Sequence, residues 1–442
     1  MSEVGADQTL GVKVGKLKFL SLRRNFSWTL LGNVVYAGCQ WGMLVALAKA
    51  GTPETVGRFA LGLAVTAPIF MQTNLNLRAV QATDAKSTYH FGDYLGLRLY
   101  TTIIALAITI IVISITGYKF ETLLVIIAIA FLKSIESLSD VLYGLFQKHE
   151  KMDIISKSMI LKGVSSLITI TLIYSITHNL FLSVIAISII KAIILLSYEG
   201  RKGLVLLNES AEIPGTGRAL ELLRITLLDK GILLNLAMLA LPLGIVMMLN
   251  SLNTNIPRYL LERSFGEREL GIFAAMAYLM VAGTTVISAL GQSASPRLAR
   301  HFAAHDMAGF RRLLAKLVLI GIAFGLLGIL VVQVGGKEIL TLFYGSEYGG
   351  YAEVLILIMV ASGMSYISSF MGVAMTAARY FKIQIPITIL SSVVILAASC
   401  SLIPKIGLKG AAISMIFMYM AQIPLKSYVL YRLMNQESRH FG

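Results

Sequence analysis

Long apolar segments recur about twelve times between Asn25 and Leu433. Each holds about 20 residues rich in Leu, Ile, Val, Ala, Met and Phe, the length that crosses a hydrocarbon core of about 30 Å. Because such a core offers no water to backbone amides, these segments must be helical. The predicted spans are 26–48, 55–77, 95–117, 122–145, 154–176, 179–199, 232–252, 269–291, 313–335, 351–376, 383–403 and 410–431. The pattern predicts an all-α polytopic membrane protein with 12 transmembrane helices.

The polar segments between the spans are short, which leaves no room for a soluble domain. The longest of them, 198–230, has the composition of a linker, with Pro214 and three nearby glycine or threonine residues. We therefore expect a first lobe of six spans in 1–200, a cytoplasmic linker in 201–230 and a second lobe in 231–442. Within the linker, residues 218–229 predict an amphipathic helix at the inner membrane interface.

Two inter-span junctions have similar sequences. Residues 51–60 and 266–274 share the pattern of Gly, a short acidic loop, a branched aliphatic residue, Gly, any residue, Phe and Ala. Six spans separate them, so a true repeat would describe two pseudo-symmetric six-helix lobes related by an axis along the membrane normal. In that arrangement the substrate site lies between the lobes. Coincidence in a chain rich in Gly and Ala is the alternative.

The basic charge follows the predicted topology. The formal net charge is +15, while charged residues are 14% of the chain, against about 25% in soluble domains. With the N-terminus in the cytoplasm, 25 of the 38 Lys and Arg residues fall in inner segments, 9 in outer segments and 4 within spans. This asymmetry places both termini in the cytoplasm and makes the charge a topology signal. We expect no nucleic-acid partner.

The sequence offers no pattern typical of an enzyme. Cys39 and Cys400 lie far apart in predicted spans and form no metal or redox motif. There is no phosphate-binding Gly-x4-Gly-Lys-Ser/Thr loop and no nucleophile–base cluster. We therefore expect a protein without catalytic residues, metal or organic cofactor.

Five stretches carry a resemblance to a known family. Taken in order and by position relative to the spans, they resemble the Wzx-type O-antigen and repeat-unit flippases of the multidrug/oligosaccharidyl-lipid/polysaccharide (MOP) exporter superfamily. The stretches are Asn33-x4-Gly38-x3-Gly42 with 51–60; Asn255-Ile256-Pro257-Arg258-Tyr259 with 266–274; Pro296-Arg297-Leu298-Ala299-Arg300 with Phe310-Arg311-Arg312-Leu313-Leu314; Leu342-Phe343-Tyr344-Gly345-x3-Tyr348; and Ile403-Pro404-x-Ile406-Gly407-x-Lys409-Gly410-Ala411-Ala412.

The resemblance implies a V-shaped bundle of two lobes in the cytoplasmic membrane of a bacterium or archaeon. It also implies that an undecaprenyl-diphosphate-linked glycan moves from the cytoplasmic to the outer leaflet by alternating access. The expected partners are that lipid-linked glycan, membrane lipids and other polysaccharide-assembly proteins. Twelve spans resemble the repeat-unit flippases better than the fourteen-span lipid II flippases.

Charges inside spans are the candidate site residues, because each costs about 2.5–3.5 kcal/mol to insert. Lys133, Glu136 and Asp140 share one face of the fourth span, Lys162 lies in the fifth and Lys191 in the sixth. The lysines could bind the diphosphate in place of its lost hydration. Alternatively, Lys133 and Glu136 form an intrahelical pair while the other two lysines extend to the interface.

Arginines near the span ends are further candidates. Arg58 and Arg258 flank the predicted outer mouth, where each either lines the cavity or anchors the helix at the interface. Arg24 precedes the first span and could contact substrate from the cytoplasm, although anchoring fits it better.

Two further features bear on transport. Glu136 and Asp140 stand one helical turn apart, and adjacent carboxylates make a plausible site for H⁺ or Na⁺ as a coupling ion.

In the seventh span, Pro242 removes a backbone hydrogen bond and Gly244 reduces stiffness, which predicts a hinge.

Three other functions compete with a flippase. A cation-coupled multidrug antiporter of the same superfamily would share the fold, and a small, carboxylate-rich cavity would favour it. A membrane-embedded glycan polymerase or ligase would need a large outer loop, whereas the predicted outer loops are short. An ion channel would need a filter-like motif, and the sequence shows none.

Overall fold

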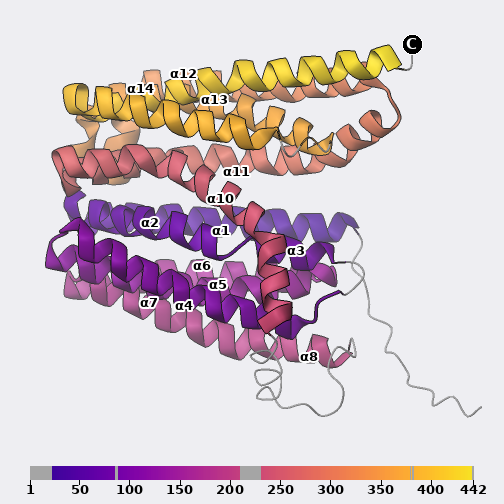
Figure 1. The fold of residues 1–442 in the computed structure, drawn as a ribbon. Coiled ribbons are helices and arrows are strands. Elements are labelled where there is room, and N and C mark those ends of the chain that lie inside the picture. Colours follow the sequence, from indigo (N-terminus) through magenta and orange to yellow (C-terminus); the bar gives the residue numbers. More distant parts are fainter. Residues whose placement is uncertain (1–21, 85–87, 210–229, 379, 381–382, 441–442) are drawn as a thin grey trace, which may run out of the picture.

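The computed structural model describes residues 22–84, 88–209, 230–378, 380 and 383–440. Within these ranges every regular element is a helix (Figure 1). The first half contains α1 (Leu22–Ala50), α2 (Pro53–Thr73), α3 (Leu77–Thr83), α4 (Phe91–Thr116), α5 (Phe120–Lys148), α6 (Met152–Thr177), α7 (Leu180–Ile194), the π-helix η1 (Leu195–Gly200) and α8 (Arg201–Glu209). The second half contains α10 (Lys230–Phe265), α11 (Glu267–Ala303), α12 (Met307–Tyr344), the 3₁₀-helix η2 (Ser346–Tyr351), α13 (Ala352–Ala377) and α14 (Gln384–His440).

The predicted spans correspond to these helices. Among the described residues, 11 helices are long and apolar enough to cross a membrane. The last, α14, is 57 residues long and breaks at Ile406 and Gly407, where the φ of Gly407 is 56°. Its two segments lie side by side, since Gln422 Nε2 donates a hydrogen bond to Ser391 Oγ at 3.1 Å. Counted as two segments, α14 completes the twelve, and the all-α polytopic fold is confirmed.

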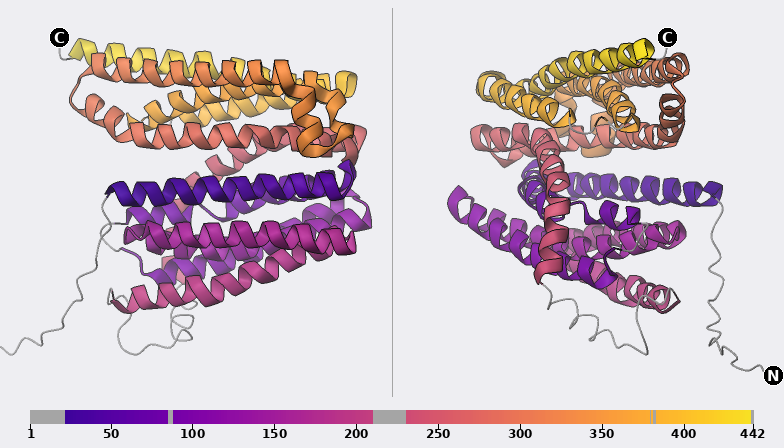
Figure 2. Two further views of the ribbon diagram at one scale, coloured as in Figure 1. Left: turned by 180° about the vertical axis from the view of Figure 1, so that it is seen from behind. Right: turned by 45° about the vertical axis from the view of Figure 1, so that its right-hand side comes forward.

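The helices form two bundles that follow the two halves of the chain (Figures 1 and 2). The start of α1 and the end of α14 lie at the same end of the molecule, which we call the terminal end. The opposite end, which we call the junction end, holds the turns between α1 and α2 and between α10 and α11. The bundles approach each other at the junction end and diverge toward the terminal end (Figure 2).

Two glycines bring the bundles together at the junction end. A Cβ added to Gly57 of α2 would lie 1.8 Å from the carbonyl oxygen of Glu267, and one added to Gly271 of α11 would lie 1.8 Å from that of Pro53. Only glycine permits such an approach of two backbones. The sequence repeat pairs Gly57 with Gly271 and Pro53 with Glu267, so the two contacts are reciprocal. A pseudo-twofold axis between the halves produces this reciprocity.

Polar contacts between the halves surround these glycines. Arg58 Nε donates to Glu267 Oε2 at 2.8 Å, and the same guanidinium contacts Glu121, while the Thr122 hydroxyl donates to Glu267 Oε1. Nearby, Trp41 Nε1 donates to the hydroxyl of Tyr344 at 2.9 Å. Since these bonds join α1, α2 and α5 to α11 and α12, the junction end is closed.

Helix α10 belongs to both bundles. Its residues Leu233, Leu236 and Ala240 are buried in a hydrophobic cluster whose other members come from the first half. The first turns of α10, which follow the predicted lobe boundary at residue 231, therefore pack against the first lobe. Figure 1 shows α10 crossing that lobe and then bending to run along the second.

The predicted hinge residues lie in this part of α10. A Cβ on Gly244 would meet the carbonyl oxygen of Gln72 at 2.7 Å, so Gly244 marks a close approach to α2. Pro242 lies inside the same continuous helix, where it removes one backbone hydrogen bond. The amphipathic helix predicted for 218–229 lies outside the described residues. The start of the predicted linker is instead α8, which continues the sixth span through η1 to Glu209.

Adding a methyl group to Gly57 or Gly271 should separate the junction end. With both native cysteines replaced by alanine, spin labels at Lys119 and Glu347, which are exposed in opposite halves, report the separation. We expect Gly57→Ala and Gly271→Ala to lengthen this distance by several ångströms, because the new Cβ overlaps a backbone oxygen. Gly38→Ala is the matched control, since a Cβ there meets nothing within 4 Å. An unchanged distance in both variants would contradict the role of the glycines.

Candidate functional site

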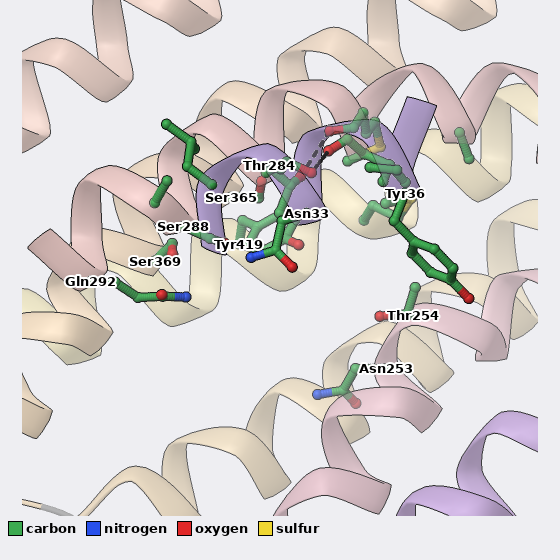
Figure 3. Close-up of a pocket in the computed structure, with 18 of the residues that line it drawn as sticks. Asn33, Tyr36, Asn253, Thr254, Thr284, Ser288, Gln292, Ser365, Ser369 and Tyr419 are labelled. Carbon is green, nitrogen blue, oxygen red and sulfur yellow. Dashed lines mark hydrogen bonds between the residues drawn. The ribbon is translucent and has the colours of Figure 1, made fainter. Parts of the chain in front are cut away.

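A cavity of about 660 Å³ lies between the two bundles. Its walls come from α1 and α6 of the first half and from α10, α11, α13 and α14 of the second. Figure 3 shows side chains from these helices converging on it. A site between the halves is the place that the internal repeat predicts.

Most polar groups on the cavity wall are uncharged hydroxyls and amides. They are Thr29, Asn33, Tyr36, Asn253, Thr254, Thr284, Thr285, Ser288, Gln292, Ser365, Ser369 and Tyr419 (Figure 3). The one charged lining residue in the described part of the chain is Arg258, and no carboxylate lines this cavity. Apolar side chains, among them Leu30, Met280 and Met415, form the rest of the wall. The cavity therefore suits a large ligand with apolar parts and with polar parts that are neutral or anionic.

Two smaller pockets, each of about 390 Å³, have Arg78 in common. The first shares Thr29, Asn33 and Gln292 with the cavity wall and adds Arg78. The second is lined by Arg78, Lys133, Glu136 and Asp140, together with residues of α2 and α10. Arg78 thus lies between the pocket that shares residues with the cavity and this second pocket, which we call the charged pocket.

The carboxylate of Glu136 is held by two lysines. Lys133 Nζ donates to Glu136 Oε2 at 2.8 Å, which is the intrahelical pair considered from the sequence. Lys191 Nζ donates to Glu136 Oε1 at 2.6 Å. Lys191 is buried behind Glu136 and does not extend to the interface, whereas Lys133 lines the charged pocket.

Asp140 is held by two arginines rather than by its neighbour Glu136. Arg98 Nη2 lies 3.0 Å from Asp140 Oδ2, and Arg78 Nη1 lies 3.8 Å from Asp140 Oδ1. Arg98 is fully buried in α4, and a buried guanidinium needs such a counter-ion. The guanidinium of Arg78 is also held by Gln147, to which Nε donates at 2.9 Å. The two carboxylates predicted to act as an adjacent pair therefore belong to separate ion clusters.

Lys162 forms a third ion pair deeper in the first bundle. Its Nζ lies 2.6 Å from Glu199 Oε1, and both side chains are buried. The hydroxyl of Ser158 donates to the same carboxylate oxygen, and Ser158 is bonded in turn to the hydroxyl of Tyr143 at 2.9 Å. Lys162 therefore lies behind the cavity walls and not on them.

The three predicted arginines have different surroundings. Arg258 lines the cavity, where its Nη1 donates to Asn255 Oδ1 at 3.1 Å. Arg58 lies in the network that closes the junction end, away from the cavity wall. Arg24 is exposed near the start of α1 at the terminal end. Of these arginines, the structure brings only Arg258 to the cavity.

Sequence reasoning missed three charged residues that the clusters depend on. Arg78 follows the second predicted span, where a basic residue signals topology. Arg98 falls within the predicted span 95–117, and a charge inside a span is the signal that marks it. Glu199 is the last residue of the predicted sixth span, where an acidic side chain is unusual.

No metal site is formed by the described residues, since no three His, Cys, Asp or Glu side chains gather to hold an ion.

Comparisons with known proteins show the family and the fold of this chain. Residues 22–302 match the family described as polysaccharide biosynthesis protein. The capsular polysaccharide biosynthesis protein CapF of Staphylococcus aureus is 30% identical over 397 residues, which cover 88% of this chain and 94% of that protein.

Solved structures show the same fold at low identity. An inward-facing multidrug resistance MATE family transporter of the MOP superfamily matches with a TM-score of 0.61 and 13% identity, over 97% of this chain and 98% of that one. An outward-facing MATE family transporter matches with a TM-score of 0.63 and 12% identity, over 94% and 96%. The chain therefore belongs to the polysaccharide biosynthesis protein family and has the fold of the MOP superfamily transporters.

Proposed function

We propose that this protein is a flippase for undecaprenyl-diphosphate-linked oligosaccharide repeat units. It moves them by alternating access from the cytoplasmic to the outer leaflet of a bacterial or archaeal cytoplasmic membrane. The observation that carries this proposal is the cavity wall, which combines hydroxyl and amide groups with a guanidinium and has no carboxylate among its described residues. Family membership supports a substrate of this class.

The two parts of the site suit the two parts of this substrate. The uncharged hydroxyls and amides of the cavity can exchange hydrogen bonds with sugar hydroxyls. The diphosphate fits beside Arg78 and Lys133 in the charged pocket, because planar guanidinium and compact ammonium groups both bind phosphate oxygens. Lys191 does not line this pocket, and we assign it the role of positioning Glu136.

The net charge of the ion pairs in the first bundle is opposite in sign to that of the diphosphate head group and similar in size. Five cations, Arg78, Arg98, Lys133, Lys162 and Lys191, lie beside three carboxylates, those of Glu136, Asp140 and Glu199. The excess is two positive charges, and a diphosphate diester carries about two negative ones. Arg258 adds a further positive charge on the cavity wall.

The charge asymmetry assigns the terminal end to the cytoplasm, with both termini on that side. Since the junction end is closed by Gly57, Gly271 and the Arg58 network, this conformation is the one that loads from the cytoplasm. Opening to the outer leaflet then requires these contacts to break.

The membrane potential supplies the driving force in this proposal. Moving negative charge outward across an inside-negative membrane gains about 2.3 kcal/mol per charge per 100 mV. Coupling to H⁺ or Na⁺ through Glu136 and Asp140 was the alternative from the sequence. Each of these carboxylates is held by two cations, so neutralising either would leave positive charges unpaired. We assign both to structural pairing.

A cation-coupled multidrug antiporter is the second candidate, because the solved structures of this fold include multidrug transporters. Organic cations bind most strongly where a carboxylate supplies the opposite charge. Tyr36, Phe273 and Tyr419 line the main cavity, but none of its described lining residues is a carboxylate, and the guanidinium of Arg258 repels cations.

Transport by the purified protein in proteoliposomes distinguishes these candidates. We expect flipping of a lipid-diphosphate-linked oligosaccharide and no accumulation of small organic cations. The reverse result would reject the flippase proposal.

Arg258→Gln should slow flipping by about tenfold, since a lost charge contact in a desolvated site costs on the order of 1.4 kcal/mol. Arg258→Lys should retain part of the activity because it keeps the charge. Arg311→Gln, at an exposed position outside the cavity, is the control and should be neutral. A wild-type rate for Arg258→Gln would show that this residue anchors the helix and does not bind substrate.

Imposed gradients test the driving force. An inside-negative potential should accelerate outward flipping, and reversing the potential should slow it. A Na⁺ gradient without a potential should have no effect. Asp140→Asn should flip more slowly because it leaves Arg98 unpaired, but its remaining activity should still follow the potential. Flipping driven by Na⁺ and lost in Asp140→Asn would restore this residue as a coupling site.

A further inference from the structure

We propose that a pocket on the surface of the first bundle binds the head group of an anionic phospholipid from the cytoplasmic leaflet. The pocket has a volume of about 280 Å³ and lies between the start of α6 and the helix formed by η1 and α8. It shares no lining residue with the cavity or with the two pockets that contain Arg78. Figures 1 and 2 show α8 at the terminal end, on the side of the first bundle that faces away from the second.

The pocket carries a net positive charge. The charged side chains that line it are Lys151, Lys157, Lys202, Asp153 and Glu209. Three lysines against two carboxylates leave one positive charge, which complements the single negative charge of a phosphodiester. Lys157 Nζ lies 3.6 Å from Asp153 Oδ2, a separation longer than a typical hydrogen bond. Because an ammonium group has three donors, Lys157 can still donate to a phosphate oxygen.

Lys157 belongs to the side of α6 that faces the lipid. Lys157, Leu161, Val164 and Ile168 are all exposed, and they follow one another at steps of four, three and four residues. This spacing places them on one face of the helix, with Lys157 nearest the terminal end. A phosphate bound at Lys157 therefore has an exposed apolar surface directly beside it, on which acyl chains can pack. A soluble anion makes no use of that surface, so the arrangement favours a phospholipid.

Aromatic residues place the pocket at the level of the lipid head groups. Tyr198 of η1 lines it, and Lys157 Nζ lies 5.3 Å from the centre of the Trp28 ring of α1. Trp and Tyr are enriched at the interfaces between membrane and water. The charge asymmetry assigns this end of the molecule to the cytoplasm, where anionic lipids bind basic pockets between transmembrane helices.

A lipid in this pocket contacts the helices that form one wall of the cavity. Lys157 stacks on Trp28, and the hydroxyl of the neighbouring Ser156 donates to the backbone oxygen of Trp28 at 2.6 Å. Thr29, the next residue of α1, lines the cavity. The lipid therefore joins α8 to the contact between α1 and α6. This lipid site is independent of which substrate the cavity transports.

Fluorescence quenching of Trp28 in vesicles tests the site with the full-length protein. The chain has two tryptophans, and Trp41→Phe leaves Trp28 as the reporter beside the pocket. The quenchers are phosphatidylglycerol and phosphatidylcholine, each with a nitroxide near the head-group end of one chain. We expect phosphatidylglycerol to bind beside Trp28 about fivefold more strongly than phosphatidylcholine for each lysine that contacts its phosphate. Equal binding of the two lipids would overturn the proposal.

Lysine variants locate the preference in this pocket. Lys202→Gln does not alter the contact with Trp28 and should lower the preference for phosphatidylglycerol about fivefold. Adding Lys157→Gln should abolish it. Lys316→Gln is the matched control, because Lys316 is an exposed lysine of α12 in the second bundle, and it should keep the wild-type preference. A full preference in Lys202→Gln contradicts the proposal even if the double variant does not fold, and so does a loss of preference in Lys316→Gln.

Inorganic phosphate separates a lipid site from a site for a free anion. Phosphate added at constant ionic strength should leave the preference for phosphatidylglycerol unchanged, because it has no acyl chains to pack on Leu161 and Val164. Loss of the preference would show that the pocket takes the free ion, and the assignment to a phospholipid would be wrong.

Discussion

The arrangement of the whole molecule depends on the approach of two backbones at the junction end. Gly57 and Gly271 each meet a carbonyl oxygen of the opposite half, at positions related by the internal repeat. Contact at this depth needs glycine on both sides, and it fixes the two bundles at one end only. The bundles then diverge, and the space that opens between them toward the terminal end is the cavity. A close contact at one end and a cavity at the other are thus two consequences of one geometric constraint.

The first bundle carries most of the buried charge, and this asymmetry has a physical reason. A charge inside a membrane protein is tolerated when a counter-ion lies beside it. In the first bundle, each of Glu136, Asp140 and Glu199 pairs with cations from a neighbouring helix. These pairs also tie α4, α5, α6, α7 and η1 together. In the second bundle, Arg258 has Asn255 as its described partner, and its buried Nε has none. A guanidinium that has no carboxylate partner among the described residues can bind an anionic ligand.

Much of the fold could be predicted from the sequence, because helix length and hydrophobicity are local properties. The twelve spans and the intrahelical pair of Lys133 and Glu136 follow from the spacing of residues along single helices, and the repeat follows from comparing two segments of the sequence. Ion pairs between different helices cannot be predicted in this way. Asp140 lies one turn from Glu136, yet it binds Arg98, which is 42 residues earlier in the chain. Glu199 meets Lys162 across 37 positions, and no pattern in the sequence connects them.

The same limit explains the errors at the candidate site. Lys191 and Lys162 were expected on a cavity wall because a lysine inside a span is a functional candidate by default. Burial against Glu136 and Glu199 satisfies each of them inside the bundle. Arg78 was assigned to topology because it lies just beyond a span, although the short helix α3 folds it back onto α5. Whether a charge faces a ligand or a counter-ion is decided by the neighbouring helix, which the sequence alone does not identify.

Helix α10 is the element through which the two lobes must communicate. Its first turns are buried with the first lobe through Leu233 and Leu236, while Arg258 near its other end lines the cavity beside the second lobe. If the lobes rotate about the pseudo-twofold axis, the ends of α10 must move relative to each other. Pro242 and Gly244 lie between those ends, at the position where α10 meets the end of α2. A missing hydrogen bond and a missing side chain make bending of α10 least costly there.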